Sequence, residues 1–124
     1  MKIAILGSGG REHAIALKIS KSKKLRKLYC IPGNAGTGLI SKNIDINLDD
    51  FYKVYNFLKD ENVDLVIVGP EQPLVDGIVD YLDKKKIKVF GPNQKVSQLE
   101  GSKIFTKKIC KKYNIPAANF GIVK

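Results

Sequence analysis

Short apolar segments that end in glycine or proline alternate with amphipathic segments along most of this 124-residue chain. Four apolar segments are predicted to be strands, and they cover residues 2–6, 28–31, 64–68 and 87–90. Because strands that alternate with helices form parallel sheets, the pattern predicts an α/β fold, a Rossmann-like open parallel sheet with helices on both faces. The length suffices for one complete domain.

Helical periodicity fills the intervals between the predicted strands. Apolar spacing predicts a helix over Arg11–Ser20, a second helix capped by Asp49 or Asp50, and a third that begins near Pro73 and continues through Leu82. The segment Pro32–Thr37 is predicted to be a loop of small, turn-forming residues.

The pattern changes near residue 100. Ser97 is predicted to open a capping box that Gly101 interrupts, Ser102 to cap a further helix, and residues 119–123 to begin another strand. We therefore expect an N-terminal domain over residues 1–100 and the truncated start of a second domain over residues 101–124. The apolar residues of 104–113 are expected to be exposed, which would favour self-association.

Turns that follow the predicted strands indicate where a ligand binds. Gly7–Gly10, Pro32–Thr37, Gly69-Pro70 and Gly91-Pro92 each follow one strand. In open parallel sheets, ligands bind outside the carboxyl ends of the strands, so we expect these turns to border the ligand site.

The first turn has the composition of an anion site. Gly9 and Gly10 let backbone N–H groups approach a phosphate at a helix N-terminus, and Arg11 can bind an anionic group. Glu12 occupies the third glycine position of the dinucleotide fingerprint, and the strand over 28–31 ends without an acidic residue. A nicotinamide cofactor is therefore disfavoured, and a nucleotide-binding domain of an oxidoreductase is kept as an alternative. The glycines could also serve only a tight turn.

Three other positions are candidate ligand contacts. The Asn34 amide offers donors and an acceptor, although an Asx turn explains it equally well. Pro70 precedes Glu71, whose carboxylate can accept hydrogen bonds from ribose hydroxyls or an amine, or can cap the helix near Pro73. We expect His13 to be a packed or capping residue rather than a catalytic one.

Composition excludes several classes of function. The net charge is +10, but only Arg11 and Arg26 are arginine, so we expect a solvated lysine surface and no nucleic-acid partner. Cys30 and Cys110 are predicted to be small buried hydrophobes, and we expect no metal cluster, no membrane segment and a cytoplasmic location.

Five segments together resemble one known family. They are GSGGREHA at 7–14, PGNAGT at 32–37, VGPEQPLVDG at 68–77, FGP at 90–92 and LEGSKIFTK at 99–107. In this order and spacing they resemble the N-terminal (pre-ATP-grasp) part of the phosphoribosylamine–glycine ligases, or glycinamide ribonucleotide synthetases, in the ATP-grasp superfamily.

The resemblance implies an ATP-dependent carbon–nitrogen ligase of purine biosynthesis, which joins glycine to 5-phosphoribosylamine through a glycyl phosphate and uses ATP with Mg²⁺ or Mn²⁺. Another ATP-grasp enzyme is the alternative. The implied contacts with the phosphoribosyl substrate are Gly9, Gly10, Arg11, Asn34, Pro70 and Glu71. Lys103 matches a lysine near the ATP phosphates. We expect no catalytic residue and no metal ligand in this fragment, which would bind the phosphoribosyl substrate without catalysis.

Overall fold

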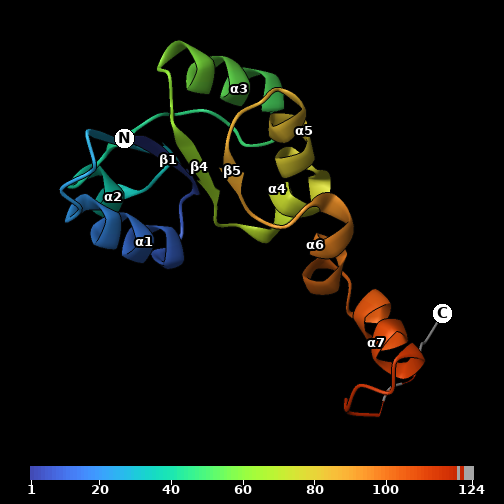
Figure 1. The fold of residues 1–124 in the computed structure, drawn as a ribbon. Helices are drawn as coiled ribbons and strands as arrows, with labels where there is room; N and C mark the ends of the chain where they lie inside the picture. Colours follow the sequence, from blue (N-terminus) through green and yellow to red (C-terminus); the bar gives the residue numbers. More distant parts are fainter. Residues whose placement is uncertain (120, 122–124) are drawn as a thin grey trace.

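The computed structural model describes residues 1–119 and 121 of the chain. Five parallel strands form one sheet in the order β3-β2-β1-β4-β5 (Figure 1). The strands are β1 (Lys2–Gly7), β2 (Lys27–Pro32), β3 (Lys42–Asn43), β4 (Leu65–Val68) and β5 (Val89–Phe90). The predicted α/β fold and its four strands are confirmed. The edge strand β3 was missed because two polar residues carry no apolar pattern.

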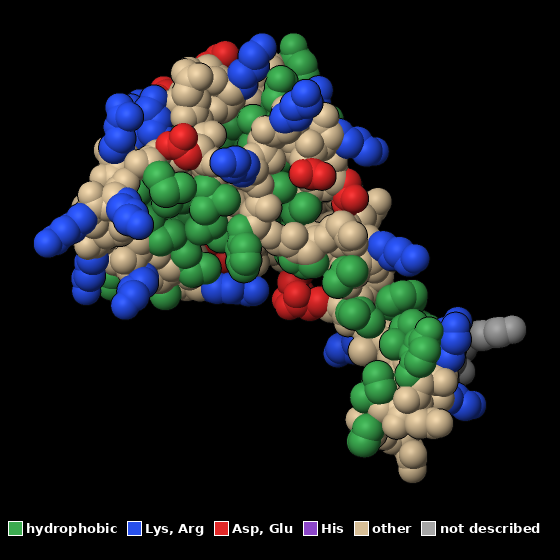
Figure 2. Space-filling model, in the orientation of Figure 1, with side chains coloured by type: hydrophobic (Ala, Val, Ile, Leu, Met, Phe, Trp, Pro, Cys, Tyr) green, Lys and Arg blue, Asp and Glu red, His purple; other side chains and the backbone are tan. Residues whose placement is uncertain are grey.

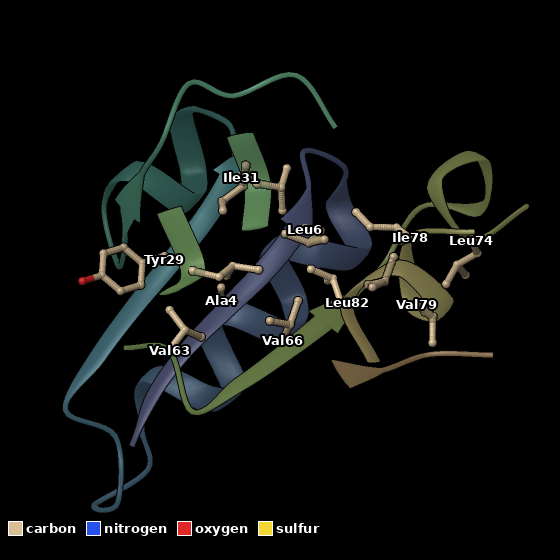
Figure 3. Packing of buried hydrophobic residues seen from close by; sticks show 13 residues of the cluster. Ala4, Leu6, Tyr29, Ile31, Val63, Val66, Leu74, Ile78, Val79 and Leu82 are labelled. Atoms are coloured by element: carbon tan, nitrogen blue, oxygen red, sulfur yellow. The ribbon is translucent and has the colours of Figure 1, made fainter. Parts of the chain in front are cut away.

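Strand β1 lies at the centre of the sheet and is buried on both faces. Ala4 and Leu6 point into a cluster with residues of α3 (Phe51–Asp60) and α5 (Ile78–Lys84) (Figure 3). Ile3 and Ile5 point the other way, towards α1 (Gly10–Ser20). Side chains alternate along a strand, so an unbroken apolar run is what a strand covered on both faces requires.

A single predicted helix is in fact two. The chain forms α4 (Glu71–Asp76) and then α5, and Gly77 between them has a φ of 95°. The expected continuous helix through Leu82 is therefore wrong. Glycine adopts this left-handed conformation without steric cost, so it ends one helix and redirects the next while the apolar spacing continues.

The predicted loop Pro32–Thr37 contains the short helix α2 (Ala35–Gly38). Asn34 caps it, because its side-chain oxygen accepts a hydrogen bond from the Thr37 N–H at 2.9 Å. The prediction of an irregular loop is wrong here, since alanine, threonine and two glycines give no apolar periodicity to recognise.

Among the described residues, two helices follow β5, and the first of them packs against α4. Helix α6 (Gln94–Gly101) is capped by Asn93, so the predicted cap at Ser97 is wrong; the Ser97 hydroxyl donates to the Asn93 carbonyl at 2.8 Å. Ser102 caps α7 (Lys103–Lys112), as predicted. The predicted strand over 119–123 falls largely outside the described residues, which lack 120 and 122–124.

Helix α7 projects from the body and buries none of its side chains (Figure 1). Hydrophobic side chains gather on the surface of this projecting part (Figure 2), and Ile104 and Tyr113 are 51% and 62% exposed. The expected exposure of this segment is confirmed. No helix in the described part of the chain is long and apolar enough to cross a membrane.

The two cysteines differ in their surroundings. Cys30 is fully buried in β2, as predicted, whereas Cys110 on α7 is only half-buried. The prediction of a buried thiol at position 110 is wrong, because α7 projects from the body and buries none of its side chains.

A charged cluster holds the amino ends of the strands. The buried Tyr29 donates its phenol hydrogen bond to Glu61, and Lys27 Nζ lies 3.7 Å from the same carboxylate. The Tyr29 hydrogen bond, aided by the nearby lysine charges, holds the pKa of Glu61 below its usual range.

This cluster predicts a pH-dependent contribution to stability. A carboxyl whose pKa is lower in the folded chain stabilises the fold above its unfolded pKa of about 4.3 and loses that effect as the pH falls through its folded pKa. Wild type is therefore expected to exceed Glu61→Gln in free energy of unfolding near neutral pH, and the difference should shrink on acidification. Urea titrations at a series of pH values measure it, and a difference that stays constant with pH would contradict the assignment.

Candidate functional site

The strand order reverses direction between β1 and β4, which are neighbours in the sheet although β2 and β3 separate them in sequence. A pocket of about 600 Å³ opens at the carboxyl ends of these strands, and its lining comes from the turns after β1, β2 and β4. Such a switch point is where open α/β sheets bind ligands. The lining residues are Gly7, Ser8, Gly9, Gly10, Arg11, Glu12, Pro32, Leu48, Pro70, Glu71, Gln72 and Pro73.

The glycine turn leads directly into α1. Gly9 is the residue before the helix, and its N–H donates to the Glu12 carboxylate at 2.6 Å. The first helical bond runs from the His13 N–H to the Gly9 carbonyl at 3.1 Å. The N–H groups of Gly10, Arg11 and Glu12 therefore belong to the open first turn, where the helix dipole favours an anion.

Arg11 and Glu71 come from two different turns and form an ion pair in the pocket lining. Arg11 Nη2 lies 4.0 Å from Glu71 Oε1, and Arg11 Nε lies 3.9 Å from Glu12 Oε1. Both Arg11 and Glu71 side chains are more than half exposed, so each remains accessible to a ligand. The pocket thus offers a guanidinium and a carboxylate next to each other.

Pro70 and Glu71 begin α4. Pro70 is the residue before the helix and Glu71 is its first residue, so the helix starts two residues before the predicted Pro73. The alternative that Glu71 caps the helix is wrong, because Pro70 occupies the cap position. The Glu71 carboxylate lies at the positive end of α4, which is favourable for an acidic side chain. Glu71 also lines the pocket.

Asn34 links two of the turns. Its side-chain N–H₂ donates to the Ser8 carbonyl at 2.7 Å, while its oxygen caps α2. Thr37, fully buried, bonds to the Asn34 backbone N–H and carbonyl, and to Asn43 of β3. The Asn34 amide thus has structural partners on both its atoms, and its contact with a ligand stays a prediction.

Four sequence candidates lie apart from the pocket lining, and Asn34 is one of them. Lys103 is exposed at the start of α7, on the projecting part of the chain (Figure 1). The Gly91-Pro92 turn follows β5 but does not contribute to the lining. His13 is half-buried and lies close enough to Gly36 that an added Cβ there would be 3.2 Å from its Nε2. This position suits the packing role expected for His13.

Sequence reasoning missed part of the site. Leu48 and Gln72 line the pocket without any motif to indicate it. Glu12 is a buried side chain with 5% exposure, which was not predicted from the sequence. The spacing of Glu12, three residues after Gly9, is that of the reciprocal half of a capping box and could have indicated its contact.

The rest of the described residues offer few other candidate sites. A second hollow, also about 600 Å³, lies between α7 and the segment that follows it, and lysines, alanines and Cys110 dominate its lining. No group of three or more His, Cys, Asp or Glu side chains that could hold a metal ion occurs within residues 1–119 and 121.

The sheet order and the pocket at its switch point define a Rossmann-like α/β domain of the kind that opens ATP-grasp enzymes. The family model described as phosphoribosylglycinamide synthetase, N domain, matches residues 1–100. The chain belongs to this family.

Relatives of known identity agree with this membership. The chain is 46% identical over 120 residues to a phosphoribosylamine–glycine ligase from Caldanaerobacter subterraneus. The aligned region covers 97% of the chain and 29% of that enzyme. A crystal structure of phosphoribosylamine–glycine ligase from Thermotoga maritima matches with a TM-score of 0.68 and 32% identity, over 96% of the chain and 26% of that structure. The chain therefore spans less than a third of the length of these relatives.

The fold extends beyond the family. The structure of N5-carboxyaminoimidazole ribonucleotide synthetase from Thermotoga maritima matches with a TM-score of 0.75 at 21% identity, over 99% of the chain and 33% of that protein. At this identity the likeness shows a shared fold and nothing about the ligand.

Proposed function

We propose that this chain is the phosphoribosyl-binding domain of an ATP-dependent ligase that joins glycine to 5-phosphoribosylamine in the cytoplasm. The observation that supports it is the pocket, which combines open backbone N–H groups at the start of α1 with Arg11 and Glu71. Family membership and the names of the relatives supply the reaction.

The pocket suits a sugar phosphate that also bears an amine. The N–H groups of Gly10 and Arg11 and the Arg11 guanidinium supply donors for a phosphate. Glu71, which lies 4.0 Å from the Arg11 guanidinium, is an acceptor for a ribose hydroxyl or for the amine. Pro70 holds the start of α4 beside this carboxylate with an extended backbone.

In the proposed reaction, the glycine carboxylate takes the terminal phosphoryl group of ATP to form glycyl phosphate and ADP. The amine of phosphoribosylamine then attacks the activated carbonyl and releases phosphate, which leaves glycinamide ribonucleotide. We propose that residues 1–100 hold the sugar phosphate and that residues 101–124 begin the ATP-grasp domain, with Lys103 near the ATP phosphates. The described residues hold no metal cluster, so we assign Mg²⁺ to the part of the enzyme that lies outside this chain.

Ribose 5-phosphate, which shares the sugar phosphate without the unstable amine, tests the proposal by calorimetry on the 124-residue chain. Arg11→Ala is expected to weaken binding about tenfold or more, because a charged hydrogen bond to an anion contributes about 1.5–3 kcal/mol. Glu71→Gln should weaken it less, since this ligand lacks the amine.

Arg26→Ala is the matched control, because Arg26 is the only other arginine and its N–H bonds to the Met1 carbonyl at the opposite edge of the sheet. This variant should bind ribose 5-phosphate as the parent does. Equal binding by the Arg11→Ala and Arg26→Ala variants, or no binding by the parent, would rule out the proposed phosphate site. In a complete ligase that contains this domain, Glu71→Ala should raise the KM for phosphoribosylamine.

A further inference from the structure

Glu12 is a buried carboxylate that the proposed binding step does not use directly. Its side chain is 5% exposed, although a carboxylate is rarely buried unless it is paired. One oxygen accepts the Gly9 N–H at 2.6 Å, and the other faces the Arg11 guanidinium at 3.9 Å. Burying a carboxylate costs free energy even when it is paired, so we expect the buried Glu12 carboxylate to have a function in the turn.

Three glycines from two different turns enclose the Glu12 side chain. A Cβ on Gly7 would lie 2.7 Å from Glu12 Cγ, a Cβ on Gly9 would lie 2.8 Å from Oε2, and a Cβ on Gly69 would lie 2.6 Å from Cδ. Gly7 ends β1 and Gly9 lies in the turn after it, whereas Gly69 follows β4. Glu12 therefore fills the space between the turns that follow β1 and β4, both of which contribute to the pocket lining.

The contact with Gly9 also decides which N–H groups a ligand can reach. Four N–H groups at the start of a helix lack helical acceptors, and in α1 these belong to Gly9, Gly10, Arg11 and Glu12. Glu12 takes the first of them. Three remain for an anion, next to an arginine that the same carboxylate faces.

We infer that Glu12 is a positioning residue, whose carboxylate holds the glycine turn in the shape that directs the Gly10 and Arg11 N–H groups at the ligand's phosphate. The inference rests on the proposed function for the ligand, but the shape of the turn can be measured without any ligand. Glu12 itself does not touch the phosphate. It acts through Gly9 and Arg11.

Hydrogen exchange followed by NMR tests the turn directly in the 124-residue chain. In Glu12→Ala, the Gly9 amide is expected to exchange at least about tenfold faster, because a hydrogen bond to a charged group is lost. The Ile5 amide in the central strand should keep its protection, which separates a local effect from general destabilisation. Glu12→Gln keeps an acceptor at the same distance and should hold Gly9 protection within about threefold of the parent.

Ribose 5-phosphate supplies the second measurement. Its affinity should fall about tenfold in Glu12→Ala and stay within about threefold in Glu12→Gln, since the amide oxygen retains the Gly9 bond. Glu12→Asp, one methylene too short to reach Gly9, should resemble Glu12→Ala and serves in its place if that variant does not fold. Glu100→Ala, at an exposed glutamate of α6, is the control and should change neither measurement.

The outcomes separate this inference from the proposed function. Unchanged Gly9 protection in a folded Glu12→Ala or Glu12→Asp chain overturns the positioning role, as does unchanged affinity for ribose 5-phosphate. If Gly9 loses its protection but the parent chain does not bind ribose 5-phosphate, the proposed function fails and the control of the turn by Glu12 stands.

Discussion

A Gly69→Ala variant is expected to lose about 3 kcal/mol of unfolding free energy, at the upper end for an overpacked site. The added Cβ would lie 2.6 Å from Glu12 Cδ and 2.7 Å from Cγ. Gly7 lies against the same side chain, since a Cβ there would be 2.7 Å from Glu12 Cγ. We therefore expect Glu12 to yield by leaving its place and breaking its bond to Gly9. Urea denaturation of the parent and variant chains measures the loss.

Gly10→Ala is the matched control, because a Cβ there would meet nothing within 4 Å. Gly10 is the first residue of α1, so alanine should leave stability unchanged or raise it by up to about 1 kcal/mol. The cause can be isolated by a double-mutant cycle. If the clash is with Glu12, Gly69→Ala should cost much less in a Glu12→Ala background, and an equal cost in both backgrounds would refute this explanation.

A Leu6→Ala variant is expected to lose about 2–5 kcal/mol, which is a large fraction of the 5–15 kcal/mol typical of a domain. Leu6 is fully buried in the central strand and packs in the cluster shared with α3 and α5 (Figure 3). The strand is held between β2 and β4, so the surrounding residues cannot easily collapse into the cavity.

Leu39→Ala provides the comparison, since Leu39 is 88% exposed. It should change the free energy of unfolding by less than about 0.5 kcal/mol. Thermal and urea denaturation of the two leucine variants should therefore differ widely. Similar losses in both would contradict the packing described for β1.

The strands of the core were predictable for a local reason. Residues 3–6, 28–31 and 65–68 are apolar without interruption, and each run is followed by a glycine or proline. A strand covered on both faces requires that pattern, and the glycine or proline that follows marks the carboxyl end of the strand. Because parallel strands align their carboxyl ends, the positions of Gly9, Arg11 and Glu71 at one edge also followed from the sequence.

Other features depended on contacts between segments distant in sequence or on the conformation of a single residue. Strand β3 exists because Lys42 and Asn43 pair with β2, and the bonds of Asn43 to Thr37 and the Asn34 carbonyl hold it there. The division between α4 and α5 rests on the conformation of Gly77. Neither leaves a periodic signal along the chain.

Apolar periodicity and helix-breaking residues act locally, so the amino-acid sequence was enough to predict the parallel α/β fold and the edge of the sheet at which polar turns gather. Packing between segments fixed three further features: Glu12 points inward between Gly7 and Gly69, Asn34 binds the Ser8 carbonyl, and Lys103 lies apart from the pocket. The direction of a polar side chain depends on which backbone groups other segments bring within reach, and that is settled when the segments pack.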